Sequence, residues 1–169
     1  TQYTLSVSGD IVDRFGKALG QASQWQFTTA PYEPSLLLDM PGTIGIHALG
    51  GDHQLRAYGY NIDNVNLALY RITPAEFVRV TGGRSWFNLR EQEPKGDLVR
   101  RWSVPVDAQL NERATITATV EQSDGETLDS GIFYLEATAP GVSQPDRRIL
   151  VNTSVNLTLK SSADQALVW

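Results

Sequence analysis

Short stretches in which apolar and polar residues alternate recur along this chain, and each predicts a β-strand with one buried face. Near the N-terminus, Tyr3, Leu5 and Val7 alternate with Thr4 and Ser6. The segment 24–29 alternates in the same way, and Gly and Asp residues suited to tight turns lie between the two segments. We therefore predict two strands joined by a turn in this part of the chain.

From residue 36 onward, short apolar runs rich in β-branched and aromatic residues recur between clusters of Gly, Asn, Asp and Pro. The predicted strands are 36–38, 55–58, 65–70, 77–80, 102–106, 114–120 and 132–137. The pair Asp124-Gly125 lies between the last two of these strands and is a strong hairpin signal. Short strands at this spacing indicate an all-β fold, a β-sandwich.

The stretch 130–160 is typical of one β-domain ending and another beginning. Its apolar run 132–135 predicts the closing strand of the first domain. After a short connection, Val155, Leu157 and Leu159 alternate with polar residues and predict an opening strand of the next domain. Residues 166–169 predict the second strand of that hairpin.

Only one helical turn is predicted. Thr73 suits an N-cap, Pro74 the first helical position and Glu76 the third, which together form a capping box. The segment 82–97 has no regular pattern, and we expect a long surface loop or an edge strand there.

The composition narrows the range of partners. The net charge of −5 and the isoelectric point near 5.0 argue against nucleic acid, which is bound through clustered Lys and Arg. The two adjacent basic pairs, Arg100-Arg101 and Arg147-Arg148, are interpreted as solvated surface pairs. No apolar stretch approaches the length of a membrane-spanning helix, so we expect no membrane insertion. Because residues 1–7 already resemble the middle of a strand, we expect the sequence to begin inside a domain.

Few residues suggest chemistry. His47 and His53 are the only histidines, and Asp52 stands beside the second, but no third ligand has a suitable spacing, so we interpret them as surface or turn residues. Asp124 and Glu126 are better explained by turn formation than by a catalytic carboxylate pair. With no cysteine in the chain, thiolate chemistry and disulfides are excluded. We therefore predict no catalytic, cofactor-binding or metal-binding residue.

Two surface functions stay open at this point. Trp86 and Phe87 stand side by side in the irregular segment and suit a sugar-binding platform, whereas Trp102 and Tyr58 are better explained by core packing. Asn152 and Asn156 begin glycosylation acceptor patterns, which in a bacterial protein would be coincidental.

A first family resemblance rests on the N-terminal residues. Segment 7–19, Val-Ser-Gly-Asp-Ile-Val-Asp-Arg-Phe-Gly-Lys-Ala-Leu, and segment 25–29, Trp-Gln-Phe-Thr-Thr, resemble the C-terminal half of a bacterial immunoglobulin-like repeat domain. The resemblance implies that the opening strands of that domain lie upstream.

A second resemblance covers residues 36–169. Segment 58–71, the Trp102 strand, Gly-Ile-Phe-Tyr-Leu at 131–135 and the tail 151–169 resemble bacterial alpha-2-macroglobulins, whose N-terminal part is a string of macroglobulin-like β-sandwiches. Phe133 stands where that family has its first aromatic Tyr. The family's thioester motif requires a cysteine, so Glu91-Gln92 and Glu121-Gln122 receive no role from it.

Together the two resemblances imply an order of domains. We expect residues 1–31 to end an immunoglobulin-like domain, 32–35 to be a linker, 36–150 to form a macroglobulin-like β-sandwich, and 151–169 to form the first hairpin of a following domain.

The leading hypothesis is a noncatalytic fragment of an extracytoplasmic, broad-spectrum protease inhibitor. Its partners would be neighbouring domains of the same chain and, through the full-length protein, proteases. The alternatives are a surface adhesion or carbohydrate-binding module, and an accessory β-domain of a secreted hydrolase.

Overall fold

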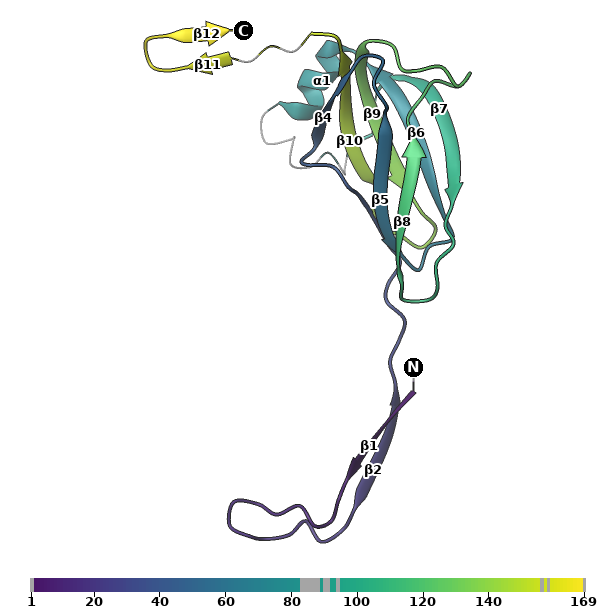
Figure 1. The fold of residues 1–169 in the computed structure, drawn as a ribbon, viewed down its shortest axis with the longest axis vertical. Helices are drawn as coiled ribbons and strands as arrows, with labels where there is room; N and C mark the ends of the chain where they lie inside the picture. Colours follow the sequence, from purple (N-terminus) through teal and green to yellow (C-terminus); the bar gives the residue numbers. More distant parts are fainter. Residues whose placement is uncertain are drawn as a thin grey trace. The chain divides into compact units, whose positions relative to one another are not determined.

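The computed structural model describes residues 2–82, 89, 92–93, 95–155, 157 and 159–168. The chain divides into two compact units, Thr1–Tyr32 and Glu33–Trp169. Figure 1 shows the elements of each unit, strands β1 to β12 and the helix α1. The prediction of an all-β fold is confirmed, and α1 is the one helix in the described residues.

The N-terminal unit is an antiparallel hairpin of β1 (Gln2–Val7) and β2 (Ser23–Thr28), as predicted. Tyr3 lies opposite Phe27, with the two rings stacked 5.4 Å apart, and Leu5 lies opposite Trp25. Between the strands, Oδ1 of Asp13 accepts hydrogen bonds from the backbone N–H groups of Phe15 and Lys17. This turn contains Gly16, whose φ of 81° lies in the left-handed region that favours glycine.

The second unit contains a β-sandwich, which confirms the predicted architecture. One sheet has three antiparallel strands in the order β3 (Ser35–Leu38), β5 (Gln54–Tyr60) and β8 (Arg113–Thr119). The other has five strands in the order β4 (Ile44–Ala48), β10 (Asp146–Thr153), β9 (Gly131–Thr138), β6 (Asn64–Ile72) and β7 (Asp97–Pro105). All neighbours in this second sheet are antiparallel except β4 and β10, which run parallel.

The core fills the space between the two sheets. Alternation places Leu36 and Leu38 of β3 inward, and Phe133 and Leu135 of β9 face them from the five-stranded sheet. The core also includes Leu55, Ala57, Val65, Leu67, Leu69, Ile116 and Leu150. Burying each large aliphatic side chain stabilises the fold by about 1.5–3 kcal/mol relative to exposure. The two-residue period of the sequence is therefore the direct cause of this packing.

The outer face of the five-stranded sheet is partly covered by α1 (Pro74–Thr81). Thr73 caps the helix by accepting a hydrogen bond from the N–H of Glu76, which confirms one half of the predicted capping box. The carboxylate of Glu76 accepts instead from Arg79 and from the N–H of Lys95. Val80 of the helix packs with Tyr134 of β9. Burial raises the pKa of Tyr134, and its hydroxyl lies 2.9 Å and 2.6 Å from the carbonyl oxygens of Leu89 and Gln92.

Two strand predictions are wrong, and two strands were not predicted. The segment 77–80 belongs to α1, because the cap at Thr73 starts a helix that runs through it. The predicted opening strand is wrong at Val155 and Leu157, which lie outside any strand: the C-terminal hairpin pairs β11 (Leu159–Ser161) with β12 (Ala166–Val168). The strands β4 and β10 were not predicted at all, and β10 extends the sandwich to Thr153.

The Asp124-Gly125 pair does not join two paired strands. The strand before it, β8, pairs with β5, and the strand after it, β9, pairs with β6 and β10. The pair forms a tight turn instead, in which the N–H of Gln122 donates to the carbonyl of Glu126 at 2.9 Å. This loop carries the chain from one sheet to the other.

Candidate functional site

The two histidines come together at the edge of the sandwich. His47 lies in β4 and His53 directly precedes β5, and their ring centroids are 5.5 Å apart. His53 is buried and His47 partly buried. The expectation of two surface or turn histidines is therefore wrong for His53, because the β4–β5 connection folds its imidazole under the sheet edge.

Asn152 of β10 fixes the orientation of His53. The Nδ2 group of Asn152 donates hydrogen bonds to the carbonyl oxygens of Leu128 at 2.6 Å and Asp129 at 3.0 Å. Its Oδ1 therefore faces His53 and lies 3.0 Å from Nε2 of that ring. Because an amide oxygen only accepts, Nε2 carries the proton and Nδ1 holds the lone pair of the neutral ring.

A small cavity of about 30 Å³ lies beside this pair, and Asp39, Met40, His47, His53 and Arg56 are among its lining residues. Partial burial lowers the pKa of His47, and the neighbouring His53 lowers it further. Both effects disfavour the charged imidazole. Among the described residues, no three His, Asp or Glu side chains are grouped so as to hold a metal ion.

A second polar cluster joins the two sheets. Asp146 of β10 is buried, accepts a hydrogen bond from the backbone N–H of Leu38 at 2.8 Å, and pairs with Arg148 at 2.5 Å. Next to it, Arg147 pairs with Glu136 of β9 at 2.6 Å. The prediction that Arg147-Arg148 is a solvated surface pair is wrong, because both side chains are largely buried and pair with carboxylates of the sheet, Arg148 with the buried Asp146 and Arg147 with the partly buried Glu136.

Arg100 and Arg101 are consecutive residues of β7 and have different surroundings. Arg100 pairs with Glu121 at 2.5 Å, and its guanidinium lies over the ring of Trp102, 5.0 Å from the centroid. Arg101 is exposed. The interpretation as a solvated surface pair therefore holds for Arg101 only. Arg100 binds Glu121 of the loop that connects the two sheets.

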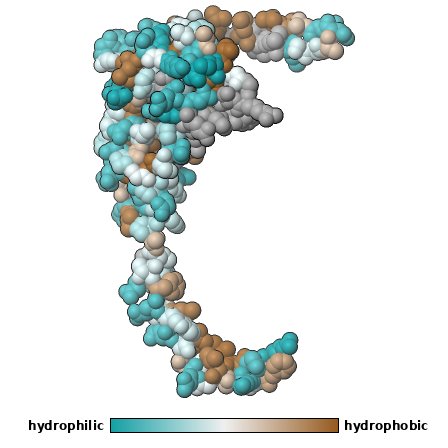
Figure 2. All heavy atoms as spheres, turned by 180° about the vertical axis from the view of Figure 1, so that it is seen from behind, coloured by the Kyte–Doolittle hydropathy of each residue, from teal (hydrophilic) through white to brown (hydrophobic). Residues whose placement is uncertain are grey.

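The N-terminal hairpin carries an exposed apolar face. Tyr3, Leu5, Trp25 and Phe27 share one side of the two strands, and each is about half exposed. Figure 2 shows hydrophobic residues at the surface of this hairpin. A two-stranded hairpin is marginally stable alone in water, so this face is suited to packing against further structure.

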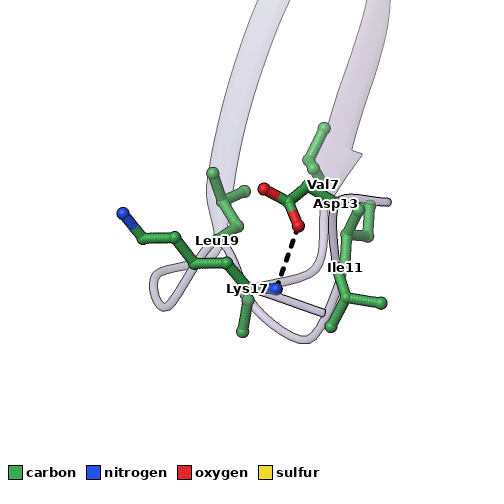
Figure 3. Close-up of a pocket in the computed structure, with 7 residues that line it drawn as sticks. Val7, Ile11, Asp13, Lys17 and Leu19 are labelled. Atoms are coloured by element: carbon green, nitrogen blue, oxygen red, sulfur yellow. Dashed lines mark hydrogen bonds between the residues drawn. The ribbon is translucent and has the colours of Figure 1, made fainter. Parts of the chain in front are cut away.

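At the turn end of the same hairpin lies an open hollow of about 570 Å³. Val7, Ile11 and Leu19 form its apolar walls, and Asp13 and Lys17 lie between them (Figure 3). The carboxylate of Asp13 is held by the N–H groups of its own turn, which explains its position without a ligand. The hollow is the concave side of a bent hairpin.

The remaining sequence candidates have structural roles. Asp124 accepts a hydrogen bond from the N–H of Glu126 within the turn, as expected for turn formation. Trp102 packs against the core as expected, whereas core packing is wrong for Tyr58, which alternates with the buried Ala57 and Gly59 and donates a hydrogen bond to Asp39 at 3.0 Å. Asn152 is buried, which prevents glycosylation there. Four candidate residues lie outside the described residues: Trp86, Phe87, Glu91 and Asn156. The sugar-binding platform, the interpretation of Glu91-Gln92 and that of the acceptor pattern at Asn156 therefore stay predictions.

Sequence reasoning missed both polar clusters. The signal for the first was a buried-type strand, 146–153, in which Asn152 interrupts an apolar pattern. The signal for the second was the sequence Asp-Arg-Arg at the start of the same strand. Neither cluster was predicted, because β10 itself was not predicted and the charged residues at its start were interpreted as part of a linker.

Comparison with solved structures finds proteins that have a similar fold. The structure is similar to alpha-2-macroglobulin from Escherichia coli spanning domains MG0-NIE-MG1, with a TM-score of 0.61 and 12% identity over 99% of this chain and 54% of that one. It is also similar to a mutant of Salmonella alpha-2-macroglobulin (TM-score 0.67, 12% identity) and to the methylamine-reacted Salmonella protein (TM-score 0.63, 13% identity). Each of the two Salmonella matches covers 94% of this chain and 9% of theirs.

This chain thus spans about half of the E. coli structure and about a tenth of the Salmonella structures. No family profile and no curated protein sequence matches the chain. At these identities the likeness establishes the fold: the chain has the β-sandwich fold of bacterial alpha-2-macroglobulin domains.

Proposed function

We propose that this chain is a noncatalytic framework segment of a bacterial alpha-2-macroglobulin-like, broad-spectrum protease inhibitor. The observation that carries the proposal is the structural likeness to the E. coli protein over 99% of the chain, which includes the N-terminal hairpin as well as the sandwich. A likeness confined to one sandwich would be weaker support, because β-sandwiches serve many unrelated functions.

The proposed domain order follows from the elements. Residues 1–31 end an immunoglobulin-like domain whose remaining strands cover the apolar face of β1 and β2. Residues 32–35 are the linker, and the macroglobulin-like sandwich begins at 36. We extend it from residue 150 to Thr153, where β10 ends, so that the hairpin of β11 and β12 opens the following domain.

A framework role fits how the polar residues are used. Asp146 pairs with Arg148 and binds the backbone of Leu38, which links the two sheets, and the Arg147–Glu136 pair links β10 to β9 within one sheet. The chain has no cysteine, so a cysteine-based thioester cannot form within it. Protease capture would therefore be a property of the full-length protein, in which this segment positions its neighbours.

The proposed location is extracytoplasmic: the cell surface, the periplasm or the medium. In the part of the chain that the structure describes, no helix has the length and hydropathy needed to span a bilayer. The location is inferred from the proposed inhibitor function, because the proteases that such a protein meets act outside the cytoplasm.

The test uses the full-length protein encoded by the same reading frame. A trap encloses a protease without blocking its active site, so trypsin mixed with the full-length protein should lose activity on casein and keep activity on a small chromogenic peptide. The isolated chain should change neither activity. Loss of both activities, or of neither, in the full-length mixture would refute protease trapping.

A matched pair of full-length variants then tests the framework role. Leu135→Ala opens a cavity in the core, whereas Leu110→Ala alters an exposed residue. Trapping should be reduced by the first and unchanged by the second. Equal trapping by both variants, with Leu135→Ala shown to be destabilised, would contradict a framework role for this segment.

A further inference from the structure

Gly45 lies against the ends of two side chains, which pack where a Cβ would otherwise stand. A Cβ placed on Gly45 would stand 2.5 Å from Cε of Met40 and 3.3 Å from Nε2 of His47. The thioether end of Met40 and the ring nitrogen of His47 therefore border the same small volume. Both side chains also line the cavity of about 30 Å³ beside the histidine pair.

His53 is a second imidazole that lines this cavity. Its hydrogen bond to Asn152 engages Nε2 and leaves the lone pair on Nδ1, the arrangement in which a polar group orients a metal-binding imidazole through its other nitrogen. With metal–nitrogen bonds of about 2.0–2.1 Å, two imidazoles on one ion have ring centres about 5–6 Å apart. The observed separation of 5.5 Å agrees with that value.

The size of the cavity and the small net charge of its walls suit one small ion that carries a single charge. A volume of about 30 Å³ is roughly that of one water molecule in the liquid. Asp39 and Arg56 line it with opposite charges, so the walls contribute little net charge.

We propose that Met40, His47 and His53 form a binding site for one soft monovalent cation of the Cu(I) class. Two imidazole nitrogens and a thioether sulfur make a ligand set that suits Cu(I), because soft sulfur ligands select soft ions and carboxylate-rich sites select hard ones. The site is built from the loop after β3, from β4 and from the start of β5, and Asn152 of β10 orients it.

Silver ion is the probe, because Ag(I) is a soft monovalent ion with the same preference for nitrogen and sulfur and needs no reductant. Isothermal titration of the 169-residue chain with silver nitrate in chloride-free buffer should give one site per chain. The chain has two histidines and one methionine. Nuclear magnetic resonance should therefore show both imidazoles and the single Met methyl group shifting together during the titration.

Three variants test the ligands. His47→Ala, at a partly buried position, should weaken silver binding about 100-fold, and Met40→Leu about 10-fold, in line with the loss of a ligand. Gly45→Ala should weaken binding without removing any ligand, because the added methyl group would stand 2.5 Å from Cε of Met40 and force that side chain to shift. Circular dichroism confirms that each variant is folded before titration.

Competition with a chromophoric Cu(I) ligand under ascorbate should give the same order of affinities. Zn²⁺ should bind at least about 10-fold more weakly than Ag⁺, because it prefers harder ligands and a fourth donor. Unchanged silver binding in folded His47→Ala, unchanged binding in folded Met40→Leu, or Zn²⁺ binding as tight as that of Ag⁺ would each overturn the proposal.

Discussion

Asp146 accepts a hydrogen bond from the backbone N–H of Leu38 at 2.8 Å, and this bond joins the first strand of the sandwich to its last. The two residues belong to different sheets, β3 and β10. Arg148 pairs with the same carboxylate at 2.5 Å. The buried carboxylate of Asp146 therefore links the two sheets where β3 and β10 meet.

Replacing this charge should destabilise the sandwich. Asp146→Ala leaves Arg148 without its carboxylate and the Leu38 N–H without its acceptor, and breaking a buried ion pair in this way costs about 3 kcal/mol. Urea unfolding monitored by circular dichroism measures the change. Asp107→Ala, at an exposed position, is the control and should lie within about 0.5 kcal/mol of the parent chain. Equal effects of the two substitutions would contradict the structural role of Asp146.

The core predicts a contrast between two leucines. Leu135 is fully buried between the sheets, whereas the residue Leu110 is 67% exposed. Leu135→Ala should lower the free energy of unfolding by about 2–5 kcal/mol through lost burial and a cavity. Leu110→Ala should change it by less than about 0.5 kcal/mol. Comparable losses would mean that the assignment of inward and outward faces is wrong.

The N-cap of α1 can be tested without touching the core. Thr73→Ala removes the oxygen that binds the N–H of Glu76 at 3.1 Å and should cost about 1 kcal/mol. Thr73→Ser keeps the hydroxyl and should restore most of the loss. Thermal melting of both variants measures the difference, and a Ser variant as unstable as the Ala variant would show that the hydroxyl does not cap the helix.

The histidine pair should make stability depend on pH. The pKa of His47 lies below its ordinary value of 6.5 in the folded chain, because partial burial and His53 disfavour its charge. Between these two pKa values the unfolded chain binds more protons than the folded one, so the free energy of unfolding falls as the pH decreases through 6.5.

Urea unfolding at about pH 7.5 and about pH 5.5 measures this dependence. In His47→Asn the difference between the two pH values should be smaller than in the parent chain. A parent chain that is equally stable at both values, or a variant with the same difference, would contradict a lowered pKa for His47.

The strands that the sequence predicts correctly are those whose own residues show a strand pattern. Segments such as 65–70 and 132–137 combine alternation with β-branched and aromatic residues, and they lie within β6 and β9. In contrast, β4 has the sequence Ile-Gly-Ile-His-Ala, which is short and contains a glycine. It is a strand because β10 supplies its hydrogen bonds, and that pairing joins residues about 105 positions apart in the chain.

The histidine site could not be predicted for the same reason. The spacing of His47 and His53 shows no third ligand, because Met40 is not among the usual zinc ligands and Asn152 lies in a strand that was not recognised. Only the pairing of β4 with β10 brings Asn152 to His53. Likewise, helix capping at Thr73 is local and was predicted, while the following strand assignment at 77–80 ignored what that cap implies.

The parallel pairing of β4 with β10 also sets an order of events during synthesis. Residues 44–48 leave the ribosome about one hundred residues before 149–153, so β4 has no partner in the five-stranded sheet for several seconds at bacterial rates of about 5–20 residues per second. Neighbouring segments such as β6 and β7 can pair earlier. The edge of the sheet, and with it the meeting of His53 and Asn152, is therefore completed only when the last strand of the sandwich emerges.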